Sequence, residues 1–241
     1  MKATLFGKMD TYSRHAYLYS AWTALIIPCV MASTMIYTSE ATIEIQNIWK
    51  AASASIPLVV FLALGYFLRE RIRVTSKLLF QFPLFKEDET HMPTTDYLMW
   101  SSDYSDEMKK AIRNKVKKDF SYTMPSKEDE RKDEKAARMN IAAIVGSMRN
   151  KARESGDAVY TQANYRYGYN RNLLGGLVWS FIITAVLMVV NFVTKSIDFW
   201  WFIAALICII LWVVLEFFVF YKYSARNYAR QLFETYLATK K

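Results

Sequence analysis

Four apolar blocks, each about as long as a lipid bilayer is thick, restrict what this chain can fold into more than any other feature. They lie at residues 17–37, 49–68, 173–193 and 199–220. A helix needs about 20 apolar residues to cross the hydrocarbon core. The blocks therefore predict four transmembrane helices, with a buried core helix as the alternative for each. The second block is the weakest, because Lys50 and two serines lie in its outer turns.

The distribution of lysine and arginine predicts the direction of these helices. The stretch between the first two blocks, TSEATIEIQNI, contains no basic residue, and the stretch between the last two, TKSID, contains only Lys195. Basic residues gather on the cytoplasmic side of membrane proteins. We therefore expect the middle segment and both chain ends to be cytoplasmic. The net charge of +9 then reflects this asymmetry and an attraction to anionic lipid.

The segment between the second and third blocks is too long for a simple connection. It contains an amphipathic pattern after Ser105, a capping-box-like start at Ser126, and a stop at Gly156 followed by a new cap at Asp157. From Asp157 the helical pattern continues into the third block without a proline. The tail has apolar positions at helical spacing, including Ala225, Tyr228, Leu232 and Tyr236.

These observations predict an all-α membrane protein with four transmembrane helices and a cytoplasmic helical bundle. The bundle is formed by the insert between the second and third spans together with the C-terminal tail. The expected divisions are an N-terminal arm with the first two spans (1–68), a cytoplasmic helical domain (69–172), the third and fourth spans (173–220) and a cytoplasmic C-terminal helix (221–241).

A segment rich in tyrosine, arginine and asparagine precedes the third block, in NYRYGYNRN. Arginine and tyrosine together can hold a phosphate and stack on a base. They can equally form an interfacial belt at lipid headgroups, and this alternative suits the residues nearest the block. The candidate ligand or regulatory residues are Tyr160, Asn164, Tyr165, Arg166, Tyr167, Tyr169 and Arg171.

A few polar residues lie inside the spans. Ser180, Thr184 and Asn191 share one face of the third span, and Glu216 is the only acid within a span. These four are candidate pore-lining residues. Ser20, Thr23 and Thr34 of the first span are similarly aligned and could also line a water path. The alternatives are that the small polar groups of both spans pack against neighbouring helices or bond to their own backbone, and that Glu216 is paired or reaches the interface.

No catalytic constellation is visible in the sequence. Cys29 and Cys208 lie in apolar blocks, His15 and His91 are isolated, and most carboxylates lie in charged runs. We expect no enzymatic activity, no cofactor and no metal.

The layout of four spans, an insert between the second and third, and YRYGYNRNL before the third resembles bacterial anti-phage membrane effectors. Those effectors, including Hailong-like ones, work beside a nucleotidyltransferase. The resemblance implies an oligomeric channel or pore in the bacterial inner membrane, which depolarises the cell and is gated by the partner or its oligonucleotide product. The alternative is a non-conducting anchor or scaffold that recruits a cytosolic partner.

Overall fold

A computed structural model describes residues 10–38, 47–86 and 89–239, with residues 47–54 as backbone only. This part of the chain is helical and contains no strand. It divides into two compact units, which are described separately. Unit 1 comprises 1–80 and 168–220, and unit 2 comprises 81–167 and 221–241.

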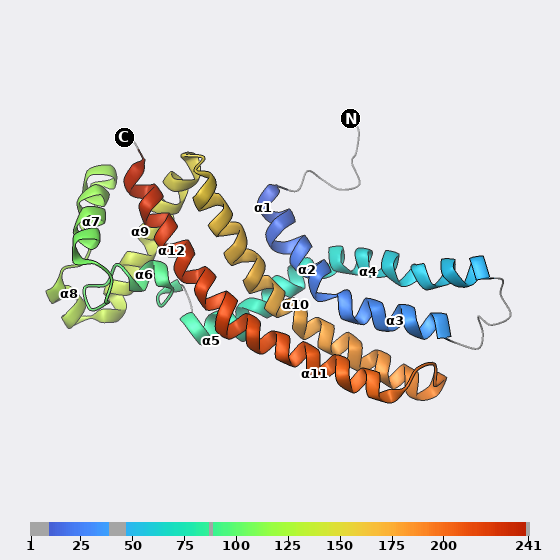
Figure 1. The fold of residues 1–241 in the computed structure, drawn as a ribbon. Coiled ribbons are helices and arrows are strands. Elements are labelled where there is room, and N and C mark those ends of the chain that lie inside the picture. Colours follow the sequence, from blue (N-terminus) through green and yellow to red (C-terminus); the bar gives the residue numbers. More distant parts are fainter. Residues whose placement is uncertain (1–9, 39–46, 87–88, 240–241) are drawn as a thin grey trace. The chain divides into compact units, whose positions relative to one another are not determined.

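The helices follow the order shown in Figure 1. In unit 1 they are α1 (Thr11–Ser13), η1 (Arg14–Leu18), α2 (Tyr19–Ala24), α3 (Ile26–Thr38), α4 (Asn47–Ser76), most of η3 (Lys77–Gln81), the larger part of α10 (Ala158–Thr194), α11 (Phe199–Leu215) and most of η5 (Glu216–Tyr221). Unit 2 contains α5 (Phe82–Phe85), α6 (Pro93–Asp96), α7 (Asp106–Phe120), α8 (Lys127–Lys132), α9 (Glu134–Glu154), the first turns of α10, and α12 (Lys222–Ala238).

Three helices among the described residues are long and apolar enough to cross a membrane. They are Thr11–Thr38, Ala158–Thr194 and Phe199–Ala238, so the chain has the character of a multi-pass membrane protein. The remaining predicted span, 49–68, lies in α4, and it stays a proposal. The prediction of an all-helical fold is confirmed.

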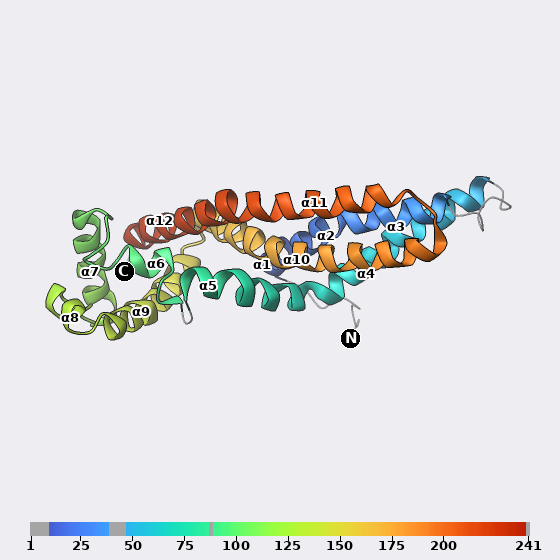
Figure 2. The ribbon, with the colours of Figure 1, turned by 90° about the horizontal axis from the view of Figure 1, so that it is seen from below.

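Unit 1 packs helices in pairs around small apolar clusters. Helices α3 and α4 lie side by side, as do α11 and the membrane part of α10, in both views (Figure 1, Figure 2). One cluster is centred on Ala24, Leu177 and Ile209, and another on Met31 and Phe202. The clusters therefore join the first span to α10 and α11.

Unit 2 confirms several local predictions. Ser105 caps α7, the capping box at Ser126 is present, and Asp157 accepts a hydrogen bond from the backbone N–H of Tyr160. Gly156 adopts a φ of +69°, which only glycine reaches at little cost. The helix expected from Ser126 onward instead breaks at Asp133, whose carboxylate accepts from the Ala136 N–H and caps α9.

Lys109 of α7 is an unusual buried charge. It is fully buried, and its ammonium donates to the carbonyl oxygens of Ser102 at 2.6 Å and Trp100 at 3.5 Å. A buried ammonium needs such partners to offset its lost hydration. The lysine therefore holds the segment before α7 in place.

Three π-helical segments interrupt the long helices of the described chain: η1, η3 and η5. The division between the units falls at the last residue of both η3 and η5. A π segment has one residue more per turn than the α-helix around it, and such segments often lie at functional sites.

Candidate functional site

Three polar atoms in the interior of unit 1 have no hydrogen-bond partner among the described residues. They are Ser180 Oγ, Thr184 Oγ1 and Glu216 Oε1. Ser180 and Thr184 are fully buried, and Glu216 is 4% exposed. A buried polar group without a partner costs about 1–3 kcal/mol, so each of the three calls for an explanation.

An apolar cluster lies one turn before Ser180. Ser180 follows the buried Leu177 by one turn of α10, and Leu177 packs with Ile209 of α11. Ser180 and Thr184 are four residues apart and therefore lie on one face of α10. Serine and threonine in a helix usually donate to their own backbone, which neither hydroxyl does here. Ser180, Thr184 and Glu216 are the candidate functional residues: the two hydroxyls share one face of α10, and Glu216 lies at the start of η5. We call these three groups the polar line.

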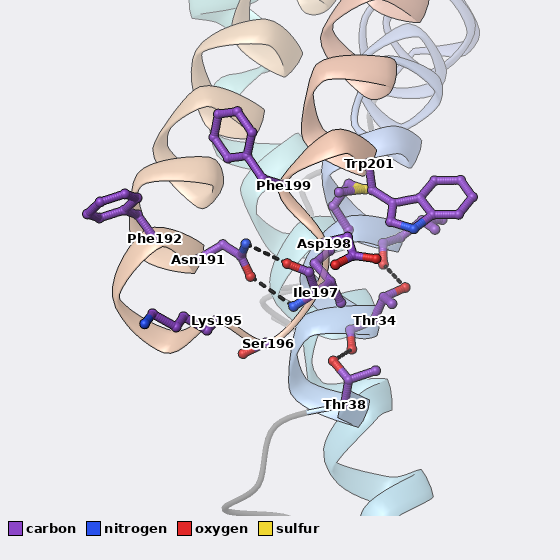
Figure 3. Close-up of a pocket in the computed structure, with 12 residues that line it drawn as sticks. Thr34, Thr38, Asn191, Phe192, Lys195, Ser196, Ile197, Asp198, Phe199 and Trp201 are labelled. Atoms are coloured by element: carbon purple, nitrogen blue, oxygen red, sulfur yellow. Dashed lines mark hydrogen bonds between the residues drawn. The ribbon is translucent and has the colours of Figure 1, made fainter.

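Asn191 does not extend the polar line with free groups. Its amide Nδ2 donates to the Ile197 carbonyl at 2.8 Å, and its Oδ1 accepts from the Ile197 N–H at 3.1 Å (Figure 3). The side chain thereby satisfies both backbone polar groups of Ile197, which lies in the turn after α10. The amide therefore holds the α10–α11 turn, and the pore-lining role of Asn191 stays a prediction.

The hydroxyls of the first span follow the alternative of bonding to the backbone. Ser20 Oγ donates to the Ala16 carbonyl at 2.8 Å, Thr23 Oγ1 donates to Tyr19 at 2.8 Å, and Thr34 Oγ1 donates to Val30 at 2.9 Å. These groups need no water, which separates them from the polar line.

The Asn172 side chain connects three segments of unit 1. The sequence did not predict this junction. Its Nδ2 donates to the Ala16 carbonyl in η1 at 2.7 Å, and its Oδ1 accepts from Ser76 Oγ of α4 at 3.2 Å. The side chain is fully buried. The sequence shows only an asparagine at the start of an apolar block. Its partners could not be predicted, because they lie 96 and 156 residues away along the chain.

Glycines let α10 approach its neighbours at this junction. A Cβ on Gly175 would lie 2.3 Å from the Ile72 carbonyl oxygen of α4, and one on Gly176 would lie 2.6 Å from Ala24 Cβ of α2. Both distances are shorter than any real contact. The paired glycines therefore allow close helix packing.

The predicted ligand segment is split between the two units. In unit 2, Tyr160 and Tyr167 are buried and stack on Tyr228, with ring centroids 5.9 Å and 5.4 Å apart. Tyr167 also stacks on Tyr221 at 5.9 Å. These rings occupy the interior of unit 2, so they hold α10 against α12 and do not form an open ligand surface.

Arg149 supports this tyrosine stack and was not anticipated. Its guanidinium lies 5.9 Å from the Tyr228 ring centroid, donates to Thr94 Oγ1 at 3.3 Å and pairs with Glu89. Burial acts to lower the pKa of Arg149, but the charge of Glu89 and the neighbouring tyrosines outweigh burial and leave the pKa above its ordinary value. The arginine therefore stays charged within the core.

The other residues of the segment have different surroundings. In unit 2, Arg166 is exposed, while Asn164 and Tyr165 are partly buried. In unit 1, the Tyr169 hydroxyl donates to Thr23 Oγ1 at 3.0 Å. Arg171 is also largely buried, and its Nε donates to Asn172 Oδ1 at 3.3 Å. A ligand role for the segment stays a prediction, and its most accessible member is Arg166.

Asp119 joins three helices of unit 2. Its Oδ2 accepts from Lys151 of α9 at 2.8 Å and from the Tyr236 hydroxyl of α12 at 3.1 Å, and it lies 3.6 Å from Lys115. Burial acts to raise the pKa of Asp119, but the Lys151 and Tyr236 hydrogen bonds and the lysine charges hold the pKa below its ordinary value.

Asp119→Asn is expected to loosen α12. Hydrogen bonds to a charged group contribute about 1.5–3 kcal/mol, and the variant loses them at neutral pH. The pKa of Asp119 is lower in the folded protein than in the unfolded chain. The stabilisation is therefore fully present above the pKa of the unfolded chain, about 3.9. It is lost as the pH falls through the pKa of the folded protein. Hydrogen exchange of α12 peptides measures the effect. The exposed Glu107→Gln on α7 is the control, and equal protection in both variants would contradict the role.

Comparisons with known proteins place no relative beside this chain. No protein-family model matches it, and neither the curated proteins nor the solved structures include a significant match. No group of three or more metal-binding side chains occurs within the described ranges. The site must therefore be interpreted from its own chemistry.

Proposed function

We propose that unit 1 is the conducting part of a membrane channel, held closed in this packing. The observation that supports the proposal is the polar line, in which Ser180 Oγ, Thr184 Oγ1 and Glu216 Oε1 lack partners. Water or a permeating ion would supply the missing partners if the surrounding helices separated. In a protein that only anchors itself in the bilayer, these groups would destabilise the fold and serve no function.

The free-energy cost of the three unpartnered groups is large enough to affect an equilibrium between a closed and an open state. Three unpartnered groups at about 1–3 kcal/mol each disfavour the closed packing by about 3–9 kcal/mol. Moving an equilibrium from 1:99 to 99:1 requires about 5.5 kcal/mol. The free energy gained by hydrating the polar line is thus comparable to the free energy that a gating signal must supply. Apolar packing and the Asn172 junction favour the closed state.

The chain offers a route from unit 2 to the polar line. Glu216 is the first residue of η5, and α12 follows η5 directly. Converting a π segment into α-helix removes one residue from the turn and rotates the helix beyond it by about 100°. A ligand or partner that favours one packing of unit 2 shifts the equilibrium by its difference in affinity for the two states.

The biological setting is part of the proposal. The resemblance to anti-phage effectors implies four spans, a homo-oligomer in the bacterial inner membrane, and cytoplasmic chain ends with a cytoplasmic bundle that contains unit 2. It also implies a nucleotidyltransferase partner, or its oligonucleotide product, as the gating signal. Depolarisation of the infected cell would follow opening.

The test uses two substitutions that remove a hydroxyl and add no bulk, Ser180→Ala and Thr184→Val. Each removes an unpartnered buried group, so each should stabilise the closed protein by about 1–3 kcal/mol. The open fraction should fall by a corresponding factor of about 5–150. A potential-sensitive dye reports conduction in cells that express the chain alone or with a nucleotidyltransferase partner, and thermal unfolding of the purified protein reports stability.

The combination of higher stability and lower conduction distinguishes a gated polar line from a packing defect. Val186→Ala, at an exposed position of the same helix, is the control and should leave conduction unchanged. If conduction is absent with and without the partner, the anchor or scaffold function replaces the channel. Arg166→Ala tests ligand control separately, because this side chain is exposed and its loss leaves the tyrosine stack intact.

A further inference from the structure

A groove opens between the end of α3 and the α10–α11 turn of unit 1, away from the polar line (Figure 3). Its volume is about 1030 Å³, at the upper end of the roughly 300–1,000 Å³ typical of ligand sites. Its walls come from α3 on one side and from the end of α10, the turn and the start of α11 on the other.

The groove is polar at one end and apolar at the other. Thr38 ends α3, and Lys195, Ser196 and Asp198 lie in or beside the turn, so the polar residues gather at the loop end. Val30 lies eight residues before Thr38, which places it about 12 Å further along the helix. The lining residue Met31 adds to the apolar part.

The hydroxyls of Thr34 and Thr38 and the amide of Asn191 already have hydrogen-bond partners. Thr34 Oγ1 donates to the Val30 carbonyl at 2.9 Å, and Thr38 Oγ1 donates to the Thr34 carbonyl at 2.8 Å. The Asn191 amide is taken by the Ile197 backbone. A hydrocarbon chain can therefore lie against these walls without leaving a hydroxyl or an amide unsatisfied.

The rim has the composition of a membrane interface. Trp200 and Trp201 are 77% and 65% exposed at the start of α11, and Phe192 is 77% exposed on α10. Exposed tryptophan at the end of a span lies at the level of lipid headgroups. Lys195 and Asp198 place both signs of charge at this level, three residues apart in the chain, with Lys195 on the side of Phe192 and Asp198 on the side of Thr34 (Figure 3).

We propose that this groove binds a glycerophospholipid with a zwitterionic headgroup that carries an ammonium, such as phosphatidylethanolamine. One acyl chain lies along Val30 and Met31, and Trp201 lies at the level of the headgroup. The phosphate is at Lys195, and the headgroup ammonium is at Asp198. The amphipathic division of the groove fits a lipid better than a second copy of the chain, which would have to cover the charged rim as well as the apolar floor.

The test measures phospholipid that remains on the full-length protein after purification in detergent, by native mass spectrometry. Val30→Trp fills the apolar part and is expected to lower bound phospholipid about tenfold, equivalent to about 1.4 kcal/mol. Val189→Trp is the control, because Val189 is exposed on α10 and does not line the groove. Asp198→Asn is expected to shift the preference from phosphatidylethanolamine toward phosphatidylglycerol.

A second measurement does not depend on the fold of Val30→Trp. A fluorophore on Thr34→Cys, with Cys29 and Cys208 replaced by serine, should be quenched by phospholipid brominated on its acyl chains. Strong quenching in small amounts of such lipid supports a bound molecule. The proposal would be overturned if Val30→Trp and Val189→Trp retained equal amounts of lipid. It would also be overturned if Thr34→Cys formed cross-links between two copies and showed no quenching.

Discussion

Gly175→Ala is expected to destabilise unit 1 by about 1–3 kcal/mol, the usual cost of an extra methyl group in a packed interior. The new Cβ would lie 2.3 Å from the Ile72 carbonyl oxygen and 2.8 Å from both the N and Cβ atoms of Ser76. Two of these three atoms belong to the backbone of α4, so no side chain can turn aside to relieve the overlap. Helix α10 must move away from α4, and the hydrogen bond between Asn172 and Ser76 lengthens.

The matched control for Gly175 lies in a different helix. Gly146 of α9 has nothing within 4 Å of an added Cβ, so Gly146→Ala should be stabilising by about 0.4–1 kcal/mol through the unfolded chain. Thermal unfolding of the full-length protein in one detergent compares the two variants. Opposite signs support the close packing of α10 on α4. A Gly175→Ala protein as stable as the parent would show that the two helices are not in this contact.

Sequence patterns predicted the elements of the fold where the cause was local. The capping box at Ser126, the positive φ at Gly156 and the cap at Asp157 each depend on residues within one turn. The length of α10 followed from a helical pattern without a proline. Apolar blocks of bilayer length were sufficient to indicate a membrane protein, and three of the four coincide with helices that are able to span.

The candidate site was predictable only in part, because its properties depend on distant partners. Ser180 and Asn191 looked alike as small polar residues in one apolar block. Asn191 bonds to Ile197 and is satisfied, whereas Ser180 has no partner among the described residues. Tyr160 and Tyr167 had the composition of a ligand site, but Tyr228, more than 60 positions further along, buries both. Periodicity shows which residues share one face of a helix, but it does not show which residues that face contacts.

Tyr228→Ala should cost about 3–5 kcal/mol, the range for removing a large aromatic ring from a core. The ring stacks on Tyr160 and Tyr167 of α10 and lies under the Arg149 guanidinium of α9. One substitution therefore removes contacts between three helices and leaves a cavity beside a charged group. We expect α12 and the first turns of α10 to lose hydrogen-exchange protection together, because the same ring holds both.

Tyr223→Ala is the control for this prediction, on the same helix and with the same change of side chain. Tyr223 is 64% exposed, so its loss should change stability by no more than about 0.5 kcal/mol. Hydrogen exchange of the full-length protein, read by mass spectrometry, compares peptides of α10 and α12 in the two variants. If Tyr228→Ala weakens α12 and leaves 158–167 protected, then α10 is held by contacts other than the stack. That result would contradict the role of the stack in holding α10 against α12.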